Sequence, residues 1–286
     1  MTNAKSLDTL IEDVYSTLTH GYADSQAADE IVEAFGNGLK DLLKSRLRPR
    51  KKSEGVLRLS AIGKPARQLW YESKGYDREE LTGDKLLKFL YGDIIEEVLL
   101  TLIKLSGHTV TNMQQKVKVA GVVGHIDAVI DGHIVDVKSA SATSFAKFEK
   151  ATLPFDDPFG YMHQISAYSK GVENKGAAFL AMNKVDGRLT LFEPSADMLP
   201  DTEERVAYLK EVIAKDTPPE RCYEPVLEKT SGNMKLSMGC TFCDFKKDCW
   251  KNANGGSGLR GFNYSFGTVF YVHVNKTPRV DEVALG

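Results

Sequence analysis

The segment Gly124–Ser141, "GHIDAVIDGHIVDVKSAS", has the composition and turn residues of a β-hairpin. The pair Asp131-Gly132 between two β-branched runs is the strongest short-range signal for a two-residue hairpin turn. Counting outward from this turn, Asp127 on the first strand faces Asp136 on the second. The sequence therefore predicts two carboxylates directly opposite each other in an antiparallel pair.

The same count predicts that His125 faces Lys138. Side chains of a strand alternate between the two faces of a sheet, so these two residues share a polar face with the two aspartates. The opposite face receives an apolar set suited to packing against a helix: Ile126, Ala128, Ile130, Val135 and Val137. One face of the hairpin is thus expected to be core, and the other charged.

Two opposed carboxylates are expected only where their repulsion is compensated, because like charges roughly 5 Å apart across a strand pair are destabilising. A divalent cation relieves the repulsion, since Mg²⁺ is bound by one or two carboxylates together with water and phosphate oxygens. Two acids followed by Asp-x-Lys also suit phosphodiester hydrolysis, in which a metal generates hydroxide and stabilises the phosphorane. A solvated sheet face with incidental acids remains the alternative.

Three motifs in order resemble a known nuclease superfamily. Asp127 followed by Asp136-Val137-Lys138 resembles the PD-(D/E)xK signature. Gly92-Asp93-Ile94-Ile95-Glu96 is similar to the Gly-x-x-x-His/Glu motif of the RecB-like branch, and Gln164-Ile165-Ser166-Ala167-Tyr168 to its Gln-x-x-x-Tyr motif. Each motif alone occurs by chance in many proteins, so the resemblance depends on their joint occurrence and order.

The resemblance implies a restriction-endonuclease-like three-layer α/β core, in which helices flank a mixed central β-sheet and an N-terminal helical segment is added. It implies a Mg²⁺- or Mn²⁺-dependent DNA nuclease, an exonuclease acting on the ends of linear DNA in replication, recombination or repair. Compact relatives of this kind are common in bacteriophages, which would place the protein in the host cytoplasm.

The resemblance also assigns roles to individual residues. Lys138 would handle the attacking water, and Gln164 and Tyr168 would position the lysine and the scissile phosphate. Residues i and i+4 share a helix face, so this last pair can address one site. The metal ligands would be Glu96, Asp127, Asp136 and the carbonyl of Val137.

The cysteines form a second group: Cys222, Cys240, Cys243 and Cys249. The last three, in "GCTFCDFKKDCW", resemble the C-terminal part of the iron-sulfur staple of CRISPR-adaptation and AddB-type nucleases. The upstream stretch "SAIGKPARQLWYESKG" is similar to the family segment that supplies the fourth cysteine, but Pro65 occupies that position. Proline cannot bind a metal, so the usual cluster cannot assemble in the usual way.

Three interpretations of the cysteines remain. Cys222 replaces the missing ligand, and the set holds a [4Fe-4S] cluster or a tetrahedral Zn²⁺. Three ligands hold a labile cluster or none, or the thiols are buried without metal. A disulfide framework is not expected of four cysteines in 286 residues without a signal segment.

Positive charge has to be local, because 37 basic and 39 acidic residues give a formal net charge of −2. The stretch "KSRLRPRKK" over 44–52 is either a solvated linker or an arm that contacts phosphates through Arg48 and Arg50. Arg67 and Lys147 are further candidates for DNA contacts.

Helical and strand patterns divide the chain into residues 1–52 with two amphipathic helices and the basic linker, 53–252 with the nuclease core and cysteine motif, and 253–286 with late strands. Core strands are expected near 114–120, 122–130, 133–139, 176–185 and 188–195, and a helix over 201–214. Phe155 and Phe159 lie in a loop beside the proposed site, as a lid or wedge over DNA or simply as packing.

No apolar run approaches the roughly 20 residues that span a bilayer, so a cytoplasmic protein without membrane contact is expected. Two other functions stay open. One is a non-catalytic DNA-binding or metal-stapled scaffold; the other is a subunit that cleaves DNA only with a helicase or recombinase bound to its N-terminal helices. An oligomer is compatible with each of these functions.

Overall fold

The structure is a computed structural model that describes residues 5–49 and 55–284. Arg50, one of the proposed DNA contacts, lies outside the described residues. The described residues form two compact units: residues 5–49, 57–63 and 81–207, here called the sheet unit, and residues 55–56, 64–80 and 208–284, the cysteine unit. This grouping differs from the three predicted segments, because the cysteine motif packs with residues 64–80 and with the late strands.

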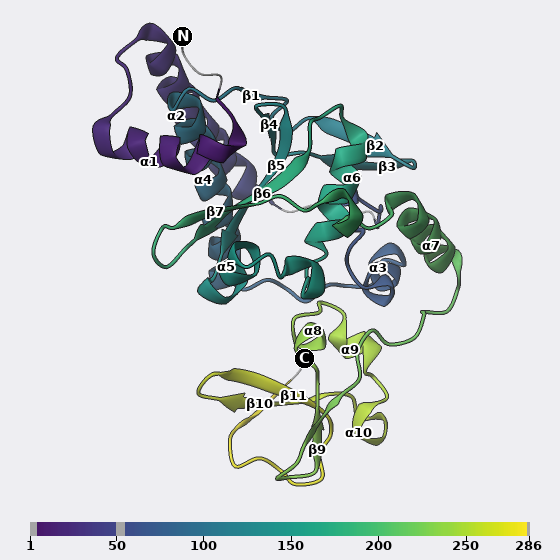
Figure 1. Ribbon diagram of the computed structural model, residues 1–286. Coiled ribbons are helices and arrows are strands. Elements are labelled where there is room, and N and C mark those ends of the chain that lie inside the picture. Colours follow the sequence, from purple (N-terminus) through teal and green to yellow (C-terminus); the bar gives the residue numbers. More distant parts are fainter. Residues whose placement is uncertain (1–4, 50–54, 285–286) are drawn as a thin grey trace. The chain divides into compact units, whose positions relative to one another are not determined.

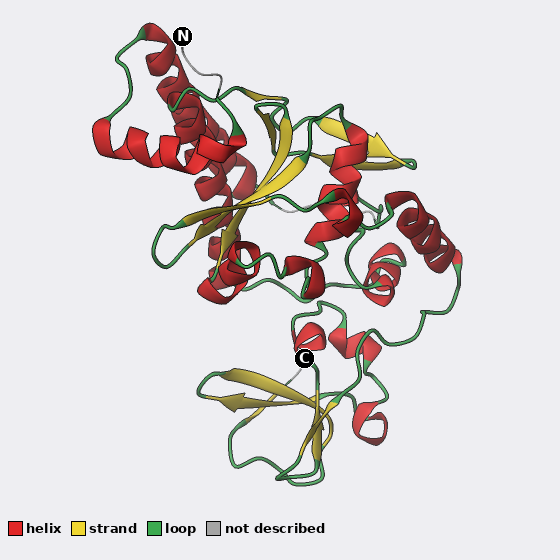
Figure 2. Cartoon of the chain, in the orientation of Figure 1, coloured by secondary structure: helices red, strands yellow, loops and turns green. Residues whose placement is uncertain are grey.

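A five-stranded mixed sheet forms the centre of the sheet unit (Figures 1 and 2). Its strands, in spatial order, are β1 (Val110–Thr111), β4 (Ala128–Ile130), β5 (His133–Ala140), β6 (Ala177–Asn183) and β7 (Leu189–Phe192). Strands β5 and β6 run parallel, and every other neighbouring pair is antiparallel. The parallel pair requires a long crossover, which the two helices between β5 and β6 provide.

The predicted hairpin turn and its register are confirmed. Asp131 and Gly132 both have positive φ, 50° and 92°, as a two-residue turn of this kind requires. Ala128 pairs with Val135 and Ile130 with His133, the register counted from the sequence. Asp127 directly precedes β4, and its Oδ2 accepts a hydrogen bond from the backbone N–H of Val137, the residue after Asp136.

The expectation that His125 faces Lys138 is wrong. His125 ends β3 (Val122–His125), which pairs with β2 (Lys116–Val119) in a separate two-stranded sheet, where it faces Lys116. The chain leaves the hairpin ladder at residues 126–127, whose backbone N–H and C=O groups bond to residues 115 and 114. The polar face of the hairpin therefore excludes the histidine.

Helices cover both faces of the central sheet, which confirms the expected three-layer class. On one face, α1 (Leu10–His20) and α4 (Gly83–Leu105) bury a cluster that includes Leu10, Val14, Ile95, Leu99, Ile103, Val135, Val137, Ala178 and Leu180. On the other face, Phe148 of α5 (Ala142–Glu149) and Tyr161 of α6 (Tyr161–Gly171) contact Phe179 of β6. Residues 178–180 alternate in direction, so these helices lie on opposite faces.

The predicted N-terminal helices form and belong to the sheet unit. Helix α2 (Gln26–Arg46) packs on α4, and its last residue, Arg46, makes a two-pronged ion pair with Asp93 at 2.5 and 2.7 Å. Helix α1 is anchored by buried His108, whose ring nitrogens lie 2.6 Å from Asp131 and 3.1 Å from Asp13. The turn of the hairpin is thus tied to the N-terminal segment.

The cysteine unit contains an antiparallel sheet of five strands in the order β12-β10-β11-β9-β8. Its elements are α3 (Ala66–Ser73), β8 (Val226–Glu228), β9 (Asn233–Lys235), α8 (Met238–Thr241), α9 (Lys246–Cys249), α10 (Ala253–Gly256), β10 (Arg260–Tyr264), β11 (Gly267–His273) and β12 (Glu282–Val283). The predicted late strands are confirmed as the hairpin β10–β11.

The remaining elements are α7 (Thr202–Ala214), which matches the predicted helix, and the 3₁₀ turns Leu7–Thr9, Leu59–Ala61, Leu153–Phe155 and Ala196–Met198. Among the helices of the described residues, none has the length and apolar character needed to cross a membrane.

Candidate active site

Residues predicted from all three motifs converge within the sheet unit. They are Glu96 on α4, Asp127 just before β4, Asp136 and Lys138 on β5, and Gln164 and Tyr168 on α6. Gly92, the first residue of the α4 motif, faces β5 closely: a Cβ at this position would lie 3.3 Å from Ser139 Oγ. The absent side chain brings the helix that carries Glu96 close to the strand that carries Asp136.

Asp136 is the centre of this group and is fully buried. Its Oδ1 accepts a hydrogen bond from Gln164 Nε2 at 3.1 Å, and the Lys138 ammonium lies against its Oδ2 in an ion pair. No hydrogen bond of acceptable geometry reaches Oδ2 from the described residues. A buried carboxylate oxygen with this spare capacity is suited to bind a cation.

Gln164 and Tyr168 share one face of α6, as their spacing predicts. Gln164 Nε2 also donates to Tyr168 Oη at 3.1 Å. Tyr168 is only 2% exposed, and burial together with the Asp136 charge raises the pKa of its phenol. The phenol oxygen therefore accepts a hydrogen bond from the Gln164 amide within the core, and its role in positioning the phosphate stays a prediction.

Asp127 and Glu96 complete the carboxylate cluster, defined here as Glu96, Asp127 and Asp136. Asp127 Oδ2 accepts a hydrogen bond from Val137 N at 2.9 Å. Burial and the charge of Asp136 raise the pKa of Asp127 to about 7. Burial and the charges of Asp127 and Asp136 raise the pKa of Glu96 to about 8. Without a cation, the cluster holds protons near neutral pH.

Two contacts of this site were not predicted. Gln114 Nε2 donates to Glu96 Oε1 at 3.0 Å, from a position with no sequence signal. The ring centre of Tyr161 lies 4.8 Å from Lys138 Nζ, a cation–π contact. The contact of Tyr161 could have been predicted from helical spacing, because residues 161, 164 and 168 share one face of α6.

Lys138 is charged in this environment. Burial acts to lower its pKa, but the charges of Asp136 and Asp127 outweigh that effect and raise it above the ordinary lysine value. Its side chain is 18% exposed. The site therefore offers a protonated amine that is held by a carboxylate and an aromatic ring and that still reaches solvent.

The donor chemistry of the carboxylate cluster fits Mg²⁺ or Mn²⁺, which prefer carboxylate oxygens. The raised pKa values of Glu96 and Asp127 show that the cluster lacks positive charge, although Lys138 forms an ion pair with Asp136 Oδ2. In residues 5–49 and 55–284, however, no three His, Cys, Asp or Glu side chains form a ready metal site. The ligands fit by type, and the arrangement without metal is held by Lys138 instead.

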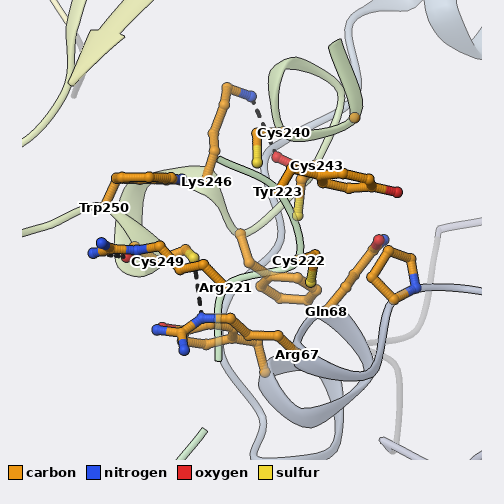
Figure 3. A pocket seen from close by; sticks show the side chains of 14 residues that line it. Arg67, Gln68, Arg221, Cys222, Tyr223, Cys240, Cys243, Lys246, Cys249 and Trp250 are labelled. Carbon is orange, nitrogen blue, oxygen red and sulfur yellow. Dashed lines mark hydrogen bonds between the residues drawn. The ribbon is translucent and has the colours of Figure 1, made fainter. Parts of the chain in front are cut away.

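The four cysteines line one pocket in the cysteine unit (Figure 3). Pro65 caps α3 at its edge, and the first-turn N–H groups of Arg67 and Gln68 face the Cys222 sulfur. Burial raises the pKa of the Cys222 thiol against the effect of those N–H groups, and burial raises that of Cys243 to about 11. Within the described part of the chain these thiols form no ready metal site either. Burial in this pocket therefore favours the protonated thiol at Cys222 and Cys243.

Arg67, proposed as a DNA contact, is directed into this pocket. Its Nε donates to Cys249 Sγ at 3.1 Å, one terminal nitrogen to the carbonyl of Pro219, and the other to Tyr71 Oη at 3.4 Å (Figure 3). All three donor nitrogens of the guanidinium thus have partners within the cysteine unit. These bonds use three of the five N–H groups of the guanidinium, so a further contact of Arg67 with DNA stays a prediction.

The other proposed DNA contacts differ in exposure. Arg48 is exposed just beyond the end of α2. Lys147 on α5 forms an ion pair with Asp156 at 2.7 Å and also donates to the carbonyl of that residue at 3.0 Å. Arg48 is the more available of the two for a phosphate.

Comparisons with known proteins give distant structural similarities only. No protein-family model and no curated protein matches the sequence. The crystal structure of SSO0001 is similar with a TM-score of 0.42 and 18% identity, over 76% of this chain and 94% of that one. An alkaline exonuclease from Laribacter hongkongensis, LHK-Exo, gives a TM-score of 0.39 and 15% identity over 61% of this chain and 94% of that one. Its complex with dAMP gives 0.37 and 15% over the same shares.

Proposed function

We propose that this protein is a metal-dependent DNA nuclease that hydrolyses phosphodiester bonds at the ends of linear DNA, with roles in replication, recombination or repair. One observation carries the proposal: Asp136 is fully buried between Gln164 Nε2 and the Lys138 ammonium, and it interacts electrostatically with two further acids that are half-buried. Such a concentration of charge is costly for folding alone, so a catalytic use explains it better than a solvated sheet face.

Glu96, Asp127, Asp136 and the Val137 carbonyl would hold Mg²⁺ or Mn²⁺. A cation bound there lowers the pKa of water and offsets the charge that develops on the phosphorane. The peptide N–H of Val137 donates to Asp127, so this backbone stretch both fixes one carboxylate and presents the neighbouring carbonyl.

Lys138 acts as a positive charge and a hydrogen-bond donor. Its raised pKa keeps Nζ protonated at neutral pH, so the amine cannot accept a proton from the attacking water. It instead orients the water and stabilises negative charge on the phosphoryl oxygens. The Tyr161 ring and Asp136 limit the directions in which the ammonium can point.

Gln164 and Tyr168 act as positioning residues. The amide of Gln164 fixes Asp136 through Oδ1, and this leaves Oδ2 for the lysine or for a cation. Tyr168 in turn fixes the amide. Loss of the amide should therefore weaken the site without exposing a new charge.

Cleavage of end-labelled linear DNA, compared with circular DNA, tests the proposal. The protein is assayed on single- and double-stranded substrates with Mg²⁺, with Mn²⁺ and with EDTA, as wild type, Lys138→Ala and Asp136→Asn. Lys118→Ala is the matched control, because Lys118 is an exposed lysine on β2 outside the site. We expect metal-dependent loss of linear DNA for wild type and control only. Cleavage that persists in Lys138→Ala, or in EDTA, would reject the assignment.

A further inference from the structure

A ladder of three aromatic rings, Phe148, Tyr161 and Phe159, begins in the core and ends at the surface. Tyr161 stacks between Phe148, at a centroid distance of 6.3 Å, and Phe159, at 5.4 Å, and both ring pairs are inclined by 29°. Phe148 is buried, whereas Phe159 is 57% exposed. The outer ring of the ladder is thus stacked on Tyr161 and otherwise largely exposed, and the Tyr161 ring contacts the ammonium of the proposed catalytic lysine.

The segment that carries Phe159 is held firmly. Asp157 caps α6, because its two carboxylate oxygens accept from Tyr161 N at 3.0 Å and Met162 N at 2.8 Å. Gly160 has a φ of +77°, and a Cβ there would lie 2.4 Å from the backbone of Gly63. Close backbone packing and the cap therefore fix the position of Phe159, although its ring is exposed.

A fixed aromatic ring with one open face is suited to stack a flat ring from a ligand. Stacking on aromatic side chains is how proteins bind the bases of single-stranded nucleic acid, because every base has such a face. A base inside a duplex already stacks on both sides and has no face to offer. Lys138 Nζ lies at most about 10 Å from the centre of the Phe159 ring, a distance that a few nucleotides of a single strand can span.

We propose that Phe159 binds an unpaired nucleobase of the substrate strand within a few nucleotides of the scissile phosphate. The inference rests on the proposed nuclease function and deepens it: the site would receive DNA as a single strand, or as a duplex whose end has opened. The Tyr161 ring would then contact both the Lys138 ammonium and the phenylalanine that stacks on the base.

Phe159→Ala removes the open face, and Phe159→Trp keeps one. Phe155→Ala is the matched control, because Phe155 lies in the same loop and is 85% exposed, but it belongs to neither the ladder nor α6. On a labelled single-stranded 20-mer we expect Phe159→Ala to lower kcat/KM between about 5-fold and 150-fold, the range for loss of one stacked base. Phe159→Trp and Phe155→Ala should stay within about threefold of wild type.

An abasic residue moved one position at a time along the 20-mer locates the stacked base. For wild type, one or two positions near the cleaved bond should lower kcat/KM; for Phe159→Ala, the same scan should show no sensitive position. Anisotropy of the labelled 20-mer in EDTA gives a second readout, in which Phe159→Ala should bind more weakly than Phe155→Ala.

The outcomes separate the two proposals. If wild type cleaves DNA and Phe159→Ala matches Phe155→Ala in both kcat/KM and binding, stacking is rejected and the nuclease stands. If wild type cleaves nothing but Phe159→Ala alone loses binding, the nuclease is rejected and base stacking stands. If there is no cleavage and binding is equal in all variants, both are rejected.

Discussion

Neutralising one acid of the carboxylate cluster should stabilise the metal-free protein. Asp127 is the best position, because its side chain accepts a hydrogen bond from Val137 N that an asparagine oxygen can also accept. Burial and the neighbouring Asp136 charge raise the pKa of Asp127 from 3.8 to about 7. Asp127→Asn removes that charge and keeps the size of the side chain. The destabilisation caused by the Asp127 charge is then measured as the difference in unfolding free energy between wild type and Asp127→Asn.

The sign follows from the direction of the pKa change. The folded protein holds the proton of Asp127 at pH values where the unfolded chain has lost it, so the free energy of unfolding falls as pH rises from about 4 to about 7. Glu96, whose pKa rises from 4.5 to about 8, extends the fall to about pH 8. The pKa of Asp127 differs by about three units between the folded and unfolded protein, and one unit is worth about 1.4 kcal/mol. Above pH 8 the charge of Asp127 therefore lowers the free energy of unfolding by about 4 kcal/mol.

Urea unfolding in EDTA at pH 4.5 and pH 8.5 measures the effect. Asp127→Asn should exceed wild type by about 2–4 kcal/mol at pH 8.5 and match it within about 1 kcal/mol at pH 4.5. Asp197→Asn is the control, because Asp197 is exposed and outside the site. Added Mn²⁺ should stabilise wild type and not Asp127→Asn. Wild-type stability that is constant or rises between the two pH values would refute the reasoning.

Three further predictions concern the cluster, the backbone and the thiols. Mn²⁺ affinity should rise on the order of 100-fold from pH 6 to pH 8, with proton release in calorimetry, because Glu96 and Asp127 must lose protons; a constant affinity would contradict this. In thermal unfolding, Gly63→Ala should destabilise the protein by more than about 2 kcal/mol, since the added Cβ would lie 2.3 Å from Gly160. In the same assay Gly36→Ala, in an open stretch of α2, should stabilise the protein by about 0.5–1 kcal/mol. Cys243, whose thiol pKa burial raises to about 11, should react with iodoacetamide about 100-fold more slowly at pH 7.5 than a free thiol; fast alkylation in peptide mapping would disprove its burial as a thiol.

The hairpin shows how far local sequence reaches. The turn residues Asp131 and Gly132 fix the turn, and the turn fixes which residues face each other, so the pairing of residues 128–130 with residues 133–135 could be counted. The count failed at His125, because the chain changes partner at residues 126–127 and bonds to a strand before the hairpin. Local turn chemistry does not say where a ladder ends.

The sequence by itself determined the alternating hairpin, the amphipathic helices and the order of the three motifs, since these depend on periodicities of two and 3.6 residues along the chain. Tertiary structure alone decided that Gln114 supports Glu96, that Arg67 turns toward Cys249, and that the cysteines pack with the late strands. It also decided that Tyr161 links Lys138 to an exposed ring. These contacts join residues whose separation along the chain follows no period, so they depend on how the elements pack.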